Sequence, residues 1–88
     1  MLQIIYASAA TRKISSEELQ DILIKARANN EALGVSGMLV YGDGSFIQVL
    51  EGPTEAVTAL VERIKGDPRH TQFRLLSRRD IAAREFGH

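Results

Sequence analysis

Residues 37–52 read GMLVYGDGSFIQVLEG, and this stretch decides the fold because it predicts two strands joined by a tight turn. Residues 37–41 and 45–50 are apolar enough for strands, and Gly-Asp-Gly at 42–44 is typical of a hairpin turn. Gln48 stands in the middle of the second strand, among apolar neighbours. A buried side-chain amide needs partners for two donors and two lone pairs, and leaving it unpaired costs about 1–3 kcal/mol. Gln48 is therefore a candidate for a ligand-binding residue.

The chain before this hairpin predicts a strand, a loop and a helix. Residues 2–7 alternate between two faces, which predicts a strand with Tyr6 on an apolar face, and residues 8–14 are typical of a loop. Ser15 and Glu18 have the spacing of a capping box that begins a helix. The apolar residues that follow recur at helical spacing, at Leu19, Ile22, Leu23 and Ala26.

This first helix is expected to end near residues 29–30, which are both asparagine. A second helix is predicted to begin at Gly52-Pro53 and to stop at residues 65–68, where Lys-Gly-Asp-Pro forbids its continuation. Its apolar stripe consists of Val57, Leu60, Val61 and Ile64. Residues 71–81 contain the last predicted strand, centred on residues 73–76.

The order of these elements is β-α-β-β-α-β, the ferredoxin-like arrangement of an α+β domain. We expect an antiparallel sheet with both helices on one face, in a single domain that spans residues 1–88. This fold serves many functions, so the function has to be argued from particular residues.

The composition excludes several functional classes. Eleven basic and 11 acidic residues give zero net charge, which argues against a nucleic-acid partner because such partners favour a basic surface. There is no cysteine, hence no disulfide, no thiol chemistry and no cysteine metal site, and we expect no metal. The first residues do not resemble a signal peptide, and no stretch approaches the ~20 apolar residues of a membrane span. We therefore expect a cytoplasmic protein without a membrane partner.

Several polar residues fall on predicted core faces. Tyr6 and Gln48 share their strand faces with aliphatic neighbours. Asn30 extends the apolar stripe of the first helix, and Asp67 extends that of the second. If both helices cover one face of the sheet, these groups surround a slot between the helices, with apolar walls at Ile22 and Ile64. An apolar slot with a few convergent polar groups is typical of a small-molecule site.

Each of these residues also has a structural explanation. A strand tyrosine usually packs in the core with its hydroxyl at the surface, a pair of asparagines usually ends a helix, and Asp-Pro usually stops one. Arg63, Arg69 and His70 belong to types that are usually solvated. Gln48 is the hardest to explain in this way, because a mid-strand amide between apolar neighbours is uncommon. The residues alone therefore indicate a site for a flat molecule with polar edges.

The chain resembles the BLUF family, blue-light sensors that bind FAD, over nearly its whole length. The similar segments are IIYAS at residues 4–8, ILIKARANNEALGVSGMLVYGDGSFIQVLEG at 22–52 and LVERIKGDPRH at 60–70. The resemblance implies a photoreceptor domain and not an enzyme. It implies FAD as the cofactor, and FMN or riboflavin would also fit because the ring carries the recognition.

The resemblance also implies a role for each candidate residue. Tyr6 would be the redox-active tyrosine, and Gln48 the switching glutamine between it and the flavin. Asn30 would hydrogen-bond the pyrimidine edge of the isoalloxazine, with Asn29 at the neighbouring, more variable site. The residues that sandwich the ring would be Ile22 and Ile64. The polar group near the end of the second helix would contact the pyrimidine carbonyl and the flavin side chain, and it comprises Arg63, Asp67, Arg69 and His70.

The mechanism implied by this resemblance is a hydrogen-bond switch. The excited flavin would take an electron and then a proton from Tyr6, and Gln48 would then rearrange its hydrogen bonds by rotation, tautomerisation or both. A stronger hydrogen bond to a flavin carbonyl would move the absorption to the red, and no substrate would be turned over. The sequence does not specify the output partner, which would be another domain or a separate protein.

The chain departs from the family pattern at its end. Family members continue past Arg84-Glu85-Phe86 into a strand that carries a tryptophan and a methionine near the switch, usually followed by helices. This chain ends at His88 and contains no tryptophan. We therefore expect a fragment, or a chain whose last strand is absent, with an exposed sheet edge and an output in doubt. Self-association through the exposed sheet face is a further hypothesis.

Three other functions are open to a chain with this order of elements. An RNA-binding domain of the same topology would need aromatic residues on its central strands and a basic face, and the third strand offers only Phe46. An acylphosphatase-like enzyme would need a backbone anion cradle, and residues 8–12 contain one arginine but no glycine. A ferredoxin-like oligomerisation or interaction module without a photocycle would leave the inward polar residues unexplained.

Overall fold

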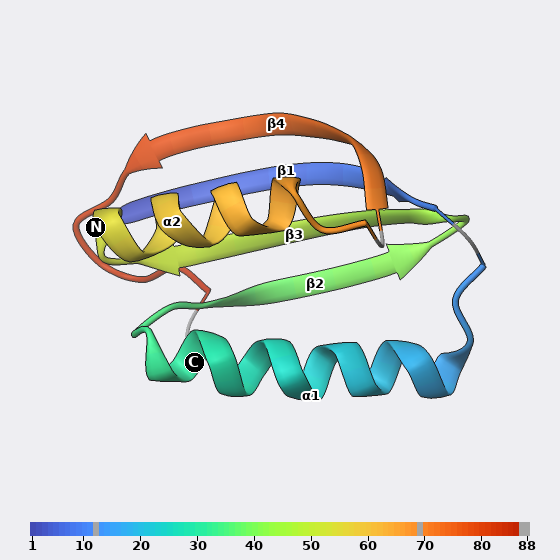
Figure 1. Ribbon diagram of the computed structural model, residues 1–88. Helices are drawn as coiled ribbons and strands as arrows, with labels where there is room; N and C mark the ends of the chain where they lie inside the picture. The colour runs from blue at the N-terminus through green and yellow to red at the C-terminus, as the bar shows by residue number, and fades with distance from the viewer. Residues whose placement is uncertain (12, 69, 87–88) are drawn as a thin grey trace.

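The computed structural model describes residues 1–11, 13–68 and 70–86, and at His70 it describes the backbone alone. Two helices and four strands follow one another along these residues (Figure 1). They are β1 (Leu2–Ala10), α1 (Ser16–Ala32), β2 (Ser36–Gly42), β3 (Ser45–Gly52), α2 (Thr54–Lys65) and β4 (His70–Asp80). This order confirms the predicted β-α-β-β-α-β arrangement.

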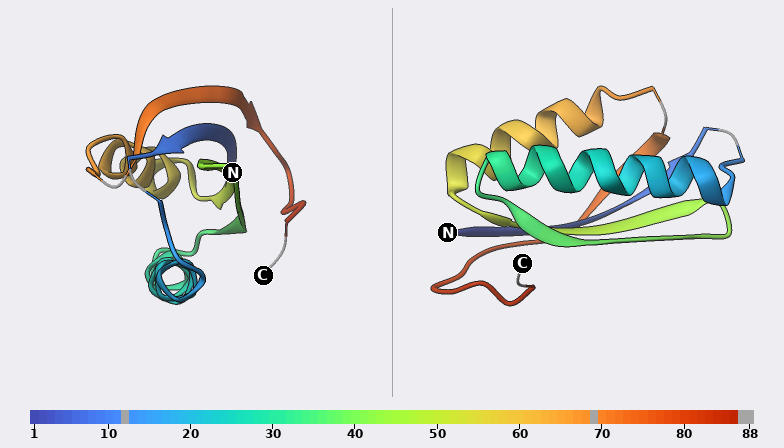
Figure 2. Two further views of the ribbon diagram at one scale, coloured as in Figure 1. Left: turned by 90° about the vertical axis from the view of Figure 1, so that its right-hand side faces the viewer. Right: turned by 90° about the horizontal axis from the view of Figure 1, so that it is seen from below.

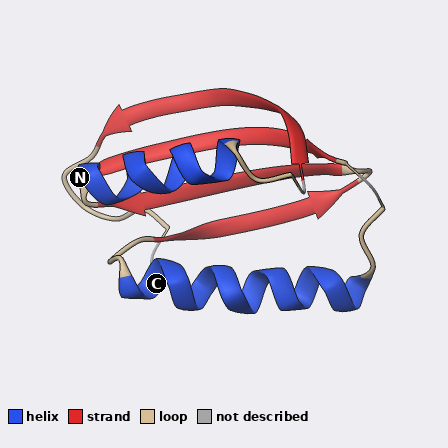
Figure 3. Ribbon diagram, in the orientation of Figure 1, coloured by secondary structure: helices blue, strands red, loops and turns tan. Residues whose placement is uncertain are grey.

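The strands form one sheet in the order β2-β3-β1-β4, and every neighbouring pair is antiparallel. Both helices lie on one side of this sheet, and the segment after β4 lies on the other side (Figure 2). Figure 3 separates the two layers by colour, with the strands in red and the helices in blue. The ferredoxin-like fold predicted from the sequence is therefore confirmed.

The turn between β2 and β3 sets the register of the hairpin. Asp43 and Gly44 have φ angles of 51° and 76°, and two positive angles in a two-residue loop match the twist of the flanking strands. Further along β2, a Cβ added at Gly37 would lie 1.8 Å from the carbonyl oxygen of Val49, so only glycine permits this close approach. The resulting register pairs Gln48 with Leu39 on β2.

Strand β1 continues beyond its predicted end, so the loop predicted at residues 8–10 is wrong. The Ala10 N–H donates to the carbonyl oxygen of Gly44 at 2.8 Å, and Ala9 and Ala10 also pair with β4. Backbone pairing with both neighbours keeps these small residues in the sheet although their side chains add little β preference. As a result, Ser8 lies on the same face of β1 as Tyr6.

Helix α1 begins as predicted and ends later than predicted. The Glu18 N–H donates to the Ser15 hydroxyl at 3.2 Å, which confirms the N-cap. The helix runs through Asn29 and Asn30 to Ala32, and Gly34 at a φ of 72° follows its end. Since both asparagines lie inside the last turns, neither serves as the C-cap that would have explained their presence.

The hydrophobic core lies between α2 and the sheet. It consists of Leu2, Ile4, Tyr6, Val35, Leu50, Val57, Leu60 and Val61. Helix α1 contributes no buried residue, and the four residues of its predicted apolar stripe are half-buried. The reason is that cavities separate α1 from the sheet, as shown below. Within the described residues, neither helix is long and apolar enough to cross a membrane.

The face of the sheet away from the helices leaves several apolar side chains in solvent. Met38, Val40 and Ile47 are each about half exposed. These residues belong to β2 and β3, and β2 is an edge strand. Self-association through this face stays a prediction.

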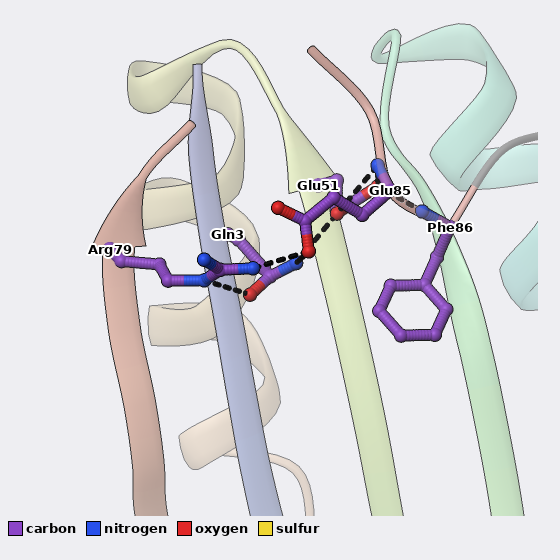
Figure 4. A network of polar contacts seen from close by, with 5 residues as sticks. All are labelled: Gln3, Glu51, Arg79, Glu85 and Phe86. Atoms are coloured by element: carbon purple, nitrogen blue, oxygen red, sulfur yellow. Dashed lines mark hydrogen bonds and ion pairs between the residues drawn. The ribbon is translucent and has the colours of Figure 1, made fainter. Parts of the chain in front are cut away.

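A polar cluster on that same face ties the C-terminal segment to the sheet, and we call it the Glu51 network (Figure 4). Glu51 has no exposed surface. Its carboxylate accepts hydrogen bonds from Gln3 Nε2 at 2.7 Å, the Phe86 N–H at 2.7 Å and the Glu85 N–H at 2.9 Å. The side-chain oxygen Oε1 of Gln3 accepts from Arg79 Nε at 2.8 Å, and Arg79 forms an ion pair with Glu85.

These donors determine the charge state of the Glu51 carboxyl. Burial raises its pKa, but the Phe86 N–H, the Gln3 amide, the Glu85 N–H and the nearby Arg84 outweigh that effect and hold the pKa below its ordinary value. Arg84 also donates to the carbonyl oxygens of Gly34 at 2.6 Å and Glu51 at 3.0 Å. Glu51 is thus a buried, ionised carboxylate whose partners all come from the chain itself.

Candidate functional site

A cavity of about 290 Å³ lies between α1, α2 and the sheet, near the lower end of the size range of ligand pockets, roughly 300–1,000 Å³. Eight of the ten residues predicted from the sequence line it, namely Tyr6, Ile22, Asn29, Asn30, Gln48, Arg63, Ile64 and Asp67. They come from two strands, both helices and the turn after α2. The fold therefore brings together side chains that are up to 61 positions apart in the sequence, from Tyr6 to Asp67.

Two predicted site residues cannot be placed in this cavity. Arg69 lies outside the described residues, and at His70 only the backbone at the start of β4 is described. Sequence reasoning also missed six residues that line the cavity, namely Ser8, Lys25, Ala26, Leu39, Phe46 and Leu60. Helical spacing from Ile22 and Ile64 would have found Ala26 and Leu60, and the cross-strand register would have found Leu39.

Tyr6 and Gln48 form the polar centre of the cavity. They are direct cross-strand partners on β1 and β3, and they are 4% and 8% exposed. The Tyr6 hydroxyl donates a hydrogen bond to Gln48 Oε1. The Phe73 ring on β4 stacks on the Tyr6 ring, with 4.6 Å between ring centroids and 23° between ring planes. The phenol is therefore held by stacking on Phe73 and by its hydrogen bond to Gln48.

The surroundings of Tyr6 disfavour the ionised form of its phenol. Burial, and secondarily the negative charge of Asp67, raise the pKa of Tyr6 well above the ordinary value of about 10. At neutral pH the phenol accordingly carries its proton and acts as the donor to Gln48.

Gln48 also borders a second and wider cavity, of about 790 Å³, between α1 and β2. The two cavities share Ala26, Asn30, Leu39 and Gln48 as lining residues. The amide nitrogen of Gln48 donates no hydrogen bond to any described protein group, in contrast to its oxygen. The donor group of the Gln48 amide is therefore unused among the described residues, at a buried position that borders both cavities.

The rim of the smaller cavity is polar, and its walls are apolar. Arg63, Lys25 and Asn29 are exposed at its rim, whereas Ile22 and Ile64 are half-buried on opposite helices. Within the described part of the chain, no set of three or more histidine, aspartate or glutamate side chains could hold a metal ion. The site therefore has the chemistry to hold a flat organic molecule with a polar edge between two aliphatic walls.

Residues 1–88 match the model of a protein family described as BLUF, sensors of blue-light using FAD. The chain belongs to the BLUF family. This BLUF domain is 44% identical over 66 residues to photoactivated adenylate cyclase subunit beta of Euglena longa, an alignment that covers 75% of the chain and 8% of that protein. It is 36% identical over 87 residues to subunit alpha of the cyclase of Euglena gracilis, covering 97% of the chain and 8% of that protein.

Solved structures of BLUF proteins have the same fold. The dark-state structure of BlrB, a BLUF protein, superimposes with a TM-score of 0.89 at 30% identity, over 97% of this chain and 64% of that one. A bacterial light-regulated adenylyl cyclase superimposes with a TM-score of 0.90 at 37% identity, over 98% of this chain and 25% of that one. The BLUF domain described here thus spans a small part of the cyclases that it resembles.

Family membership establishes that the domain is a blue-light sensor that binds flavin, as predicted from the sequence. The residues of the smaller cavity fit such a cofactor. Amides of Asn30 and Gln48 offer donors and acceptors that suit the pyrimidine edge of an isoalloxazine, and the aliphatic walls of Ile22 and Ile64 suit its two faces. The domain itself is a sensor, and the enzymes named above are much longer proteins.

Proposed function

We propose that the smaller cavity binds the isoalloxazine of FAD and that the Tyr6–Gln48 pair converts absorbed light into a change of hydrogen bonding. The observation that carries the proposal is the buried hydrogen bond from Tyr6 to Gln48, whose amide also borders open space. When bound, the flavin supplies absorption of blue light and a strongly oxidising excited state. The remaining steps belong to side chains of this chain.

The ring is held by both helices in this proposal. Ile22 on α1 and Ile64 on α2 cover its faces, since both line the cavity from opposite helices. Asn30 hydrogen-bonds the pyrimidine edge, and Asn29 binds beside it nearer to solvent. Four residues at the end of α2 and beyond it contact the carbonyl edge and the flavin side chain, namely Arg63, Asp67, Arg69 and His70.

Tyr6 is the electron donor. Its phenol is neutral at pH 7, as any tyrosine with an ordinary pKa of about 10 would be, and burial and the charge of Asp67 raise its pKa further. The same negative charge stabilises a phenol that has lost an electron, which is cationic until it also loses its proton. The hydrogen bond to Gln48 Oε1 gives that proton a path from the Tyr6 hydroxyl.

Gln48 is the switch because its terminal amide carries a donor and an acceptor on a rotatable group. In the starting state its oxygen accepts from Tyr6. Rotation or tautomerisation exchanges the donor and acceptor positions, so that Gln48 presents a different hydrogen bond to the ring and to its neighbours. A local change of this kind produces a signal when it biases a bistable element.

The first test uses the only two tyrosines of the chain as a matched pair. Purified protein loaded with FAD is measured by absorption in the dark and under blue light. The wild type and Tyr41→Phe, altered at a half-buried tyrosine of β2 outside the cavity, should shift to the red and relax in the dark. Tyr6→Phe should keep its flavin and show no shift, because no phenol remains to give an electron. A normal photocycle in Tyr6→Phe would refute the assigned role.

FAD is the proposed natural flavin, and titration with riboflavin, FMN and FAD tests this choice. Comparable affinities would place recognition in the ring, and a clear preference for FAD would show contacts to its adenosine part. We further propose that this domain controls an output domain or a separate partner, as the names of the cyclases suggest for those proteins. A cytoplasmic location is proposed because a chain without cysteine has no need of an oxidising compartment.

A further inference from the structure

Ser8 carries a buried hydroxyl group that the Tyr6–Gln48 mechanism does not use. Its side chain is on β1, is 4% exposed and lines the smaller cavity. Within the described residues, the Ser8 hydroxyl is the one fully buried side-chain polar group that has no hydrogen-bond partner.

An unpartnered hydroxyl in this position needs a physical reason. Burying a polar group without a partner is unfavourable, and the large majority of such groups in proteins are paired. Other buried polar side chains of this sheet follow that rule. Gln3 and Glu51 bind each other, Ser36 binds Arg84, and Gln48 binds Tyr6. Among the buried polar side chains described in this sheet, Ser8 is therefore the one that makes no hydrogen bond at all.

The position of Ser8 indicates what its partner would be. Its cross-strand partner is Phe46, which offers no side-chain acceptor. The residues on either side of it in β1, Ala7 and Ala9, already pair with both β3 and β4. Ser8 is two residues from Tyr6 on the same face of β1, a separation of about 7 Å along a strand. A rigid ring held by Gln48 at one point can reach that distance with another of its polar atoms.

We propose that Ser8 is a further flavin-binding residue, whose hydroxyl donates a hydrogen bond to an acceptor atom of the bound flavin. This inference rests on the proposed function of the cavity. Ser8 would add a further hydrogen bond to those proposed for Gln48 and Asn30, and it would restrain the flavin from the β1 side of the cavity. Ser8 thus positions the ring relative to the Tyr6–Gln48 pair without taking part in electron transfer.

Two effects of Ser8→Ala test this role, one on the affinity for flavin and one on the stability of the flavin-free protein. Ser8→Ala should weaken the binding of riboflavin about two- to tenfold, the loss expected for one neutral hydrogen bond. The same substitution should leave the melting temperature of the flavin-free protein unchanged or higher, because it removes a hydroxyl that has no protein partner. Ser45→Ala, at an exposed serine on β3, is the control and should change neither quantity. Binding is followed by quenching of flavin fluorescence.

Lumiflavin, which has the ring but no ribityl chain, locates the contact. A similar loss of affinity for lumiflavin assigns the hydrogen bond to the ring, and a loss for riboflavin alone assigns it to the ribityl chain; both results support flavin binding by Ser8. Ser8→Cys, of similar size but a weaker donor, should fall between Ser8→Ala and the wild type.

The proposal is overturned if wild type and Ser8→Ala bind riboflavin equally well, while the proposed function of the cavity would survive that result. It is also overturned if Ser8→Ala lowers the melting temperature of the flavin-free protein, because the hydroxyl would then have a structural partner. A wild-type protein that binds no flavin would overturn both proposals together, and the two failures are therefore distinguishable.

Discussion

Two polar pairs on the same two strands differ in how their bonding capacity is filled. Gln3–Glu51 and Tyr6–Gln48 are both direct cross-strand partners on β1 and β3, three residues apart on opposite faces of the sheet. On the outer face, Glu51 accepts from three groups of the chain itself (Figure 4). On the helix face, Tyr6 is the one hydrogen-bond partner of the Gln48 side chain in the described part of the protein, and Gln48 borders two cavities.

This difference separates a structural role from a binding role. A buried polar group whose partners all belong to the chain has already recovered its desolvation cost, so it stabilises the fold and holds residues 84–86 in place. A buried polar group with unused donors facing a cavity keeps part of that cost until a ligand supplies the partner. The position of a polar residue on a core face therefore does not show by itself whether the residue binds a ligand. The number of its unmet hydrogen bonds separates the two roles.

The largest predicted effect is on stability at the outer pair. Glu51→Ala removes the acceptor of the buried Gln3 amide and of two part-buried backbone N–H groups, and it should lower the free energy of unfolding by about 3 kcal/mol. Gln48→Ala, three residues away on the same strand, should cost about 1 kcal/mol at most and should abolish the light-induced red shift. Urea unfolding of the flavin-free proteins measures both. Equal losses of stability at the two positions would remove the distinction drawn here.

A second prediction concerns pH, where the two pairs should act at opposite ends of the scale. The lowered pKa of Glu51 gives stability that is fully present above the unfolded glutamate pKa of about 4.3 and is lost as the pH falls toward the folded value. The raised pKa of Tyr6 gives stability that is present below about pH 10 and is lost at higher pH, where the unfolded phenol ionises and the folded one does not.

The loss of stability at acid pH (the acid limb) and the loss at alkaline pH can be separated by substitution. Urea midpoints measured from pH 3 to pH 11 should show a weaker acid decline in Glu51→Gln and a weaker alkaline decline in Tyr6→Phe. An acid limb that is identical in Glu51→Gln and the wild type would contradict the assignment of that limb to Glu51.

The smallest predicted effect is on affinity at the end of α1. Asn30 is half-buried and borders both cavities, whereas the neighbouring Asn29 is exposed at the rim. Asn30→Ala should weaken FAD binding about fivefold, the loss of one hydrogen bond, and Asn29→Ala should weaken it less. Fluorescence titration gives both affinities. Unchanged affinity in Asn30→Ala would move the pyrimidine contact to another residue.

The sequence predicted most of the helix-face site because strands and helices impose simple periods. Alternation placed Tyr6 and Gln48 on inward faces, and helical spacing placed Asn30 and Ile64 toward the sheet. The prediction failed for Ser8, since the small residues at 8–10 have little strand preference and their pairing with β3 and β4 keeps this segment in β1. Local composition cannot report such long-range pairing.

The Glu51 network was out of reach for a similar reason. Glu51 precedes Gly52 at the end of a strand, where a glutamate is normally solvated, and its donors lie more than 30 positions away in the sequence. Nothing in the spacing of these residues indicates that the backbone of Glu85 and Phe86 turns back to the outer face of the sheet. The burial of Glu51 depends on tertiary contacts with a distant segment, and only a structure shows such contacts.

The central claim is that the unmet hydrogen bonds of the helix face are met by flavin. The most direct test is thermal unfolding of the wild-type protein without flavin and with FAD at a hundredfold excess over its dissociation constant. A ligand that binds only the folded state then adds about 2.7 kcal/mol, which should raise the melting temperature of a domain of this size by roughly 10–20 °C. An unchanged melting temperature over a range of FAD concentrations would contradict the claim.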